Sequence, residues 1–78
     1  MDKKLTSGIV TIGESCVAWT NQEVESGVWC VEANWHLVKD GVTKDSKTRT
    51  AYDAPLTPDD MEKKLQKKLD KFTAEEQV

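Results

Sequence analysis

The segment VWCVEANWHLVKDG, residues 28–41, is the part of the sequence that decides the fold. Side chains alternate between the two faces of a β-strand, so residues 28–38 divide into two sets. One face carries Trp29, Val31, Ala33, Trp35 and Leu37. The other face carries Val28, Cys30, Glu32, Asn34, His36 and Val38. The first set is typical of a core face, and the second is mixed.

Asp40-Gly41 follows this strand and predicts a two-residue hairpin of type I′. Counting outward from the turn pairs Trp29 with Tyr52, Glu32 with Arg49 and His36 with Asp45. A single register therefore places an aromatic pair inside and opposite charges outside. The sequence predicts a second strand that runs to Tyr52.

A third strand is expected before the Val28 strand, across a loop at residues 20–26. With Val17 facing Trp29, Cys16 would lie opposite Cys30 on the outer face. Val10 and Ile12 also favour the core, but their parity is wrong by one residue. Either a β-bulge at Gly13-Glu14 or a tight turn there, which creates a short fourth strand, restores the parity. The bulge is the preferred interpretation.

Residues 57–72 predict a helix. Thr57 is a suitable N-cap, Pro58 fits the first helical position, and two aspartates follow at the positive end of the helix dipole. An apolar stripe consists of Met61, Leu65, Leu69 and Phe72. Residues 74–78 are expected to be a frayed tail. The predicted fold class is α+β, with a three-stranded antiparallel meander, the short fourth strand as its alternative, and one C-terminal helix on the tryptophan face.

The chain has 78 residues and a formal charge of −3, which predicts one small, soluble domain spanning residues 1–78. It has no apolar run long enough to span a membrane, and Met1-Asp2-Lys3-Lys4 does not begin a secretory signal. A cytoplasmic location is therefore expected, with Cys16 and Cys30 as free thiols. A strained, reducible disulfide between these two cysteines is the alternative.

Catalysis is not expected from this sequence. The single histidine, His36, lies six residues from Cys30 on one strand, about 20 Å away, which is too far for a shared metal or a thiol–imidazole pair. Phosphate-binding glycine loops and hydrolase or metalloprotease motifs are absent from the sequence. We therefore expect a protein that is not an enzyme and that carries neither a metal nor a cofactor.

Two surfaces are candidates for binding. A weakly apolar patch with a charged rim, typical of a protein contact or a homodimer, is predicted on the open face of the sheet. Its predicted members are Cys16, Ala18, Val28, Cys30 and Ala51, and Trp19, which the alternation places on the core face at the strand end close by, is added as a contact residue. Trp19 is expected to be the most exposed tryptophan. The alternative is that these small side chains simply tolerate solvent.

Basic residues form the second candidate surface, a nucleic-acid contact. Its members are Lys47, Arg49, Lys63, Lys64, Lys67, Lys68 and Lys71. The alternative is a solvated helix face whose lysine stems cover the core. The favoured hypothesis is a protein-binding module, an inhibitor or adaptor of the kind that phages and mobile elements encode. A nucleic-acid-binding module and a structural subunit of a larger assembly are the alternatives.

Overall fold

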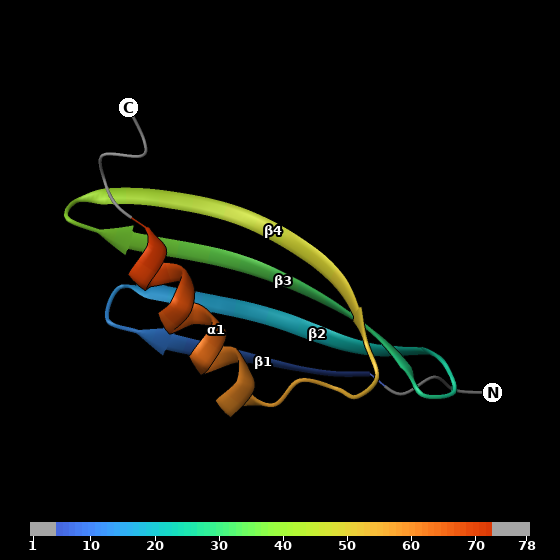
Figure 1. Cartoon of the computed structure of the whole chain (residues 1–78). Coiled ribbons are helices and arrows are strands. Elements are labelled where there is room, and N and C mark those ends of the chain that lie inside the picture. Colours follow the sequence, from blue (N-terminus) through green and yellow to red (C-terminus); the bar gives the residue numbers. More distant parts are fainter. Residues whose placement is uncertain (1–4, 73–78) are drawn as a thin grey trace.

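A computed structural model describes residues 5–72 and shows a four-stranded antiparallel sheet followed by one helix (Figure 1). The strands are β1 (Leu5–Ile12), β2 (Ser15–Glu25), β3 (Val28–Lys39) and β4 (Val42–Tyr52). They lie side by side in chain order, β1-β2-β3-β4. The helix α1 (Pro58–Lys71) crosses one face of the long, curved sheet. The α+β class and the meander with its C-terminal helix are confirmed.

Two-residue turns join all four strands. At Asp40-Gly41 both residues have positive φ, 54° and 78°, as a type I′ turn requires. The β3–β4 register is the predicted one, with Trp29 opposite Tyr52 and His36 opposite Asp45. Local turn chemistry therefore sets this hairpin.

The predicted bulge at Gly13-Glu14 is wrong, and the turn that was its alternative is present. Gly13 has a φ of 61° at the first central position, where a two-residue hairpin turn of type II′ favours glycine. The chain reverses there, so β1 pairs Val10 with Val17. This reversal places even-numbered residues of β1 opposite odd-numbered residues of β2, which resolves the parity problem. The fourth strand has eight residues and is not short.

The predicted β2–β3 register is also wrong. Val17 pairs with Trp35 and not with Trp29, while Cys16 pairs with His36 and not with Cys30. The expected loop at residues 20–26 is mostly strand, since β2 continues to Glu25 and the turn occupies only residues 26–27. A β-bulge between Glu23 and Glu25 keeps odd-numbered residues on the core face of both strands. The core and open faces of β2 and β3 were therefore predicted correctly. Each β2 residue, however, pairs with a β3 residue six positions further along the chain than the predicted one.

The helix begins as predicted. Thr57 and Asp60 form a capping box, in which the Thr57 side chain accepts from the Asp60 backbone N–H and the Asp60 carboxylate accepts from the Thr57 N–H. The hydrogen bond that the Asp60 carboxylate accepts from the Thr57 N–H favours the charged carboxylate, and with a smaller contribution from the Thr57 side chain it lowers the pKa of Asp60 from its ordinary value. At the other end, the Lys39 ammonium on β3 donates to the Leu69 carbonyl at 2.9 Å. The predicted tail at residues 74–78 lies outside the described residues.

The core lies between α1 and the inner face of the sheet. Its buried side chains are Val17, Trp19, Trp29, Val31, Ala33, Trp35, Leu37, Met61, Leu65 and Phe72. The helix backbone approaches β1 most closely and also contacts β2 and β3. Along the inner face of β4, Lys44, Ser46 and Thr50 are exposed, whereas Val42, Thr48 and Tyr52 are partly buried. Within residues 5–72 no helix is both long and apolar enough to cross a membrane.

Asn21 connects the sheet to the segment that leads into the helix. It is 2% exposed, and its amide nitrogen donates to the Leu56 carbonyl at 2.9 Å and to Thr6 Oγ1 at 3.0 Å. The Leu56 N–H in turn donates to Asn21 Oδ1 at 3.0 Å. A polar residue therefore occupies a core position because the incoming chain satisfies its hydrogen-bonding groups.

Candidate interaction surfaces

The open face of the sheet, which α1 does not cover, is ordered in four rows that run from β1 to β4. The rows are Leu5-Gln22-Cys30-Ala51, Ser7-Thr20-Glu32-Arg49, Ile9-Ala18-Asn34-Lys47 and Thr11-Cys16-His36-Asp45. The eight side chains from β1 and β2 are all uncharged. Most of the charge lies on β3 and β4. We call the β1–β2 portion the neutral half of the open face.

The predicted protein-binding residues are not brought together. Cys16 and Ala18 belong to the neutral half. Cys30 and Ala51 share one row at the end near the Ser26-Gly27 turn, and this row lies two rows from Ala18 and three rows from Cys16. Val28 pairs with Glu25 at that same end. Trp19 lies on the core face, as predicted, but it is buried there with 4% exposure, so the prediction that it is the most exposed tryptophan is wrong. The predicted patch residues lie apart because the observed β2–β3 register differs from the predicted one by six residues.

Within residues 5–72 the two most exposed large apolar side chains were not among the predicted site residues. Leu5 is 65% exposed and Ile9 is 72% exposed, and both project from β1 into the neutral half. Ile9 borders a hollow of about 670 Å³ that is lined by Ser7, Gly8, Ile9, Ala18, Trp19, Thr20, Glu32, Asn34 and Lys47. The signal in the sequence was β1 itself, LTSGIVTI, which is an uncharged strand at the sheet edge.

Charged contacts border the neutral half on the side of β3 and β4. The Lys47 ammonium lies 3.8 Å from the Glu32 carboxylate. Arg49 Nε donates to Cys30 Sγ at 3.2 Å, and this contact, with the nearby Glu32 charge, raises the pKa of Arg49. These exposed contacts contribute little stability. Their arrangement gives an uncharged area with a charged rim.

Cys16, His36 and Asp45 lie in one of the rows. This arrangement was not predicted, because the predicted β2–β3 register paired Cys16 with Cys30. His36 Nδ1 is hydrogen-bonded to Asp45 Oδ1. The order thiol, imidazole and carboxylate is that of a nucleophile, a base and an orienting group. Among the described residues, however, no hydrogen bond joins Cys16 to His36, and both His36 and Asp45 are open to solvent. No catalytic role is assigned to this row.

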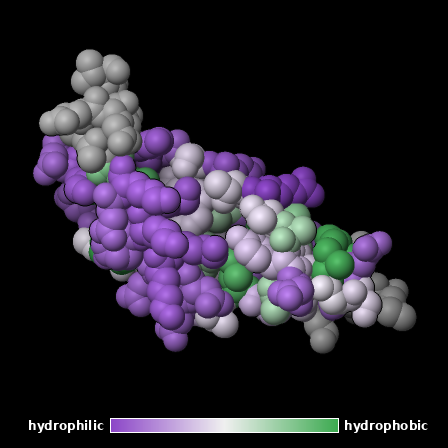
Figure 2. Space-filling view, in the orientation of Figure 1, coloured by the Kyte–Doolittle hydropathy of each residue, from purple (hydrophilic) through white to green (hydrophobic). Residues whose placement is uncertain are grey.

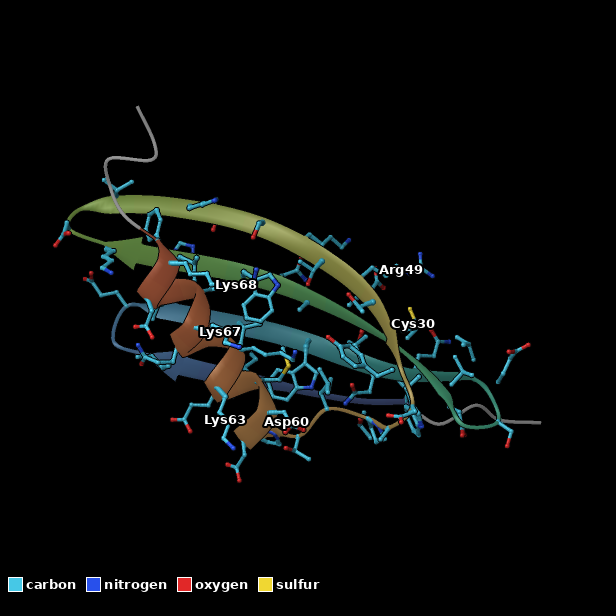
Figure 3. The ribbon with its side chains drawn as sticks, in the orientation of Figure 1. Cys30, Arg49, Asp60, Lys63, Lys67 and Lys68 are labelled. Atoms are coloured by element: carbon cyan, nitrogen blue, oxygen red, sulfur yellow. The ribbon has the colours of Figure 1, made fainter. Side chains whose placement is uncertain are left out.

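The predicted basic surface is divided between the two faces of the sheet. Lys47 and Arg49 point to the open face, while the helix lysines lie on the covered side. Four of these lysines line a groove of about 320 Å³ between α1 and β4, which is lined by Trp35, Thr48, Thr50, Tyr52, Lys64, Lys67, Lys68 and Lys71. Lys63 does not line it, and Figure 3 shows Lys63 near the start of α1, apart from Lys67 and Lys68. The surface around α1 is strongly hydrophilic (Figure 2).

Residues 5–72 contain no group of three or more histidine, cysteine or acidic side chains arranged to hold a metal ion. Comparison of the chain with protein-family models, curated proteins and solved structures finds no match.

Proposed function

We propose that this protein is a non-enzymatic binding module that contacts another protein through the neutral half of its open face and the edge of β1. The observation that carries the proposal is the exposure of Leu5 and Ile9 on an uncharged edge strand. An apolar side chain that is mostly exposed gains free energy when a partner buries it, at about 25 cal/mol per Å². The charged rim supplies orientation and specificity.

The two edges of the sheet differ in a way that supports this proposal. On β4 the charged residues Lys44, Asp45, Lys47 and Arg49 discourage pairing with another strand. On β1 the segment from Leu5 to Ile12 has no charge and no proline. A partner strand can therefore add to β1 and place its side chains beside Leu5 and Ile9, as in β-strand addition.

The test is affinity capture from native cells with Ile9→Glu, followed by identification of the retained protein. Because Ile9 is exposed, the substitution should preserve the circular dichroism spectrum and still abolish capture. Thr43→Glu is the matched control, since it adds the same charge to the same face at the opposite edge strand. Slowed amide exchange in β1 of the purified complex would locate the contact. Equal retention by Ile9→Glu would refute the assignment.

A further inference from the structure

We propose a second binding site, separate from the open face, in which the groove between α1 and β4 binds the phosphate backbone of a single-stranded nucleic acid. Lys64, Lys67, Lys68 and Lys71 form the helix wall of this groove, and Thr48 and Thr50 lie on the sheet wall. No carboxylate is among its described lining residues, although the chain as a whole has a charge of −3. Positive charge is therefore concentrated in one place on a mildly acidic protein.

The groove continues beyond these residues. An adjoining hollow of about 180 Å³ shares Lys68 and Lys71 and adds Lys44 and Ser46. The inner side of β4 thus presents three hydroxyls, those of the exposed Ser46 and Thr50 and the partly exposed Thr48, at intervals of about 6.8 Å, because alternate residues of a strand share a face. Ammonium groups face this row of hydroxyls from the helix. Both kinds of group donate hydrogen bonds to phosphate oxygens.

Packing holds part of the lysine wall in place. Lys68 Nζ lies 4.8 Å from the centroid of the Trp35 ring, and Lys64 Nζ lies 5.3 Å from that of Tyr52. Trp35 is itself oriented by its indole N–H, which donates to Thr48 Oγ1 at 2.8 Å. Among residues 5–72, none of the four helix lysines in the groove forms an ion pair. Within this part of the chain no carboxylate neutralises their charges.

The shape of the groove favours a single strand over a duplex, because its donors lie on two opposing walls and can surround one flexible backbone. Its chemistry also favours nucleic acid over an acidic peptide. Peptide grooves need apolar pockets for side chains, whereas six of the eight residues that line this groove are threonines or lysines, which carry a hydroxyl or an ammonium group, and Tyr52 is a partly exposed ring at one end. Basic residues beside an aromatic ring are typical of contacts with single strands.

The experiment is fluorescence anisotropy with a labelled oligothymidylate of about 12 nucleotides, a duplex of equal length and an oligoglutamate of equal length. Four phosphate contacts predict a slope of log K against log salt near −2.8 for the single strand. Lys67→Gln and Lys71→Gln, both at exposed positions, should each flatten this slope by about 0.7 and weaken binding about eightfold at about 50 mM salt. Lys63→Gln, which removes the same charge from the same helix outside the groove, should leave binding unchanged.

Three results would overturn the proposal. They are an absence of single-strand binding at about 50 mM salt, equal losses in Lys63→Gln and Lys67→Gln, and equal or tighter binding of the duplex or the oligoglutamate. Ile9→Glu serves as a further control. It should leave nucleic-acid binding intact, so the outcome at this groove is independent of the outcome at the open face.

Discussion

Gly8 lies directly against the indole ring of Trp19, its cross-strand partner: a Cβ atom built on Gly8 would come within 2.7 Å of Trp19 Cη2. Cβ atoms in van der Waals contact with another residue essentially never approach so closely. The ring is buried and cannot move away without disturbing the core. Glycine at this position is therefore required by packing, because the side chain of Trp19 occupies the space that a Cβ would need.

Gly8→Ala should consequently destabilise the fold by about 1–3 kcal/mol, the usual cost of overpacking. Urea denaturation measures this change. Ser7→Ala, the next residue on the opposite face, should cost little. In a Trp19→Phe background the clashing ring atoms are absent, so Gly8→Ala should cost less there than in the parent. An equal cost in both backgrounds would show that the ring contact is not the cause.

Asn21→Ala should destabilise the protein by about 2–5 kcal/mol, because it removes the hydrogen bonds to Leu56 and leaves the backbone groups of that residue without partners. The loss should appear as faster amide exchange at Leu56 together with a lower midpoint of denaturation. Gln22→Ala, at the adjacent exposed position, is the control. If the two variants were equally stable, Asn21 would not anchor the segment before the helix.

The capping box gives stability a dependence on pH. The lowered pKa of Asp60 means that its carboxylate stabilises the folded state above the unfolded pKa, near 3.8, and that this contribution is lost as pH falls through the lower folded value. The difference in unfolding free energy between the parent and Asp60→Asn should therefore be constant at neutral pH and shrink below about pH 4. Asp59→Asn removes a charge one residue away that does not bond to Thr57, and it should show a weaker dependence. Identical profiles for the two variants would contradict the assignment.

Cys16 and Cys30 should remain free thiols under mild oxidation. Cys30 lies six residues along β3 from His36, the partner of Cys16, so the two cysteines are about 20 Å apart. A disulfide needs Cα atoms within about 7 Å. Thiol titration of the unfolded, oxidant-treated protein should count both thiols, and its intact mass should not fall by the two hydrogens that a disulfide removes. An intramolecular bond in the folded protein would require a different register.

The successes and failures of the sequence-based predictions have clear physical origins. The β3–β4 hairpin and the start of the helix are encoded locally, by Asp40-Gly41 and by Thr57-Pro58, and both were predictable. The β2–β3 register was not, because Asn21 looks like a loop residue until the distant Leu56 satisfies it. The exposed edge at Leu5 and Ile9 was missed for a related reason: assigning β1 as an edge strand required the turn at Gly13-Glu14. The groove between α1 and β4 could not be predicted, because it depends on where α1 lies relative to β4 in three dimensions.

The order β1-β2-β3-β4 also has a consequence for how the molecule assembles. Each strand meets its partner across a two-residue turn, so the hairpins close with little loop entropy and can form early. Contacts such as Asn21 with Leu56 and Lys39 with Leu69 connect residues 30 or more positions apart, and they form only when the helix docks. During synthesis the whole sheet precedes residues 58–71. Its tryptophan-rich face is therefore bare until the helix follows, and this interval is when the chain is most prone to aggregate.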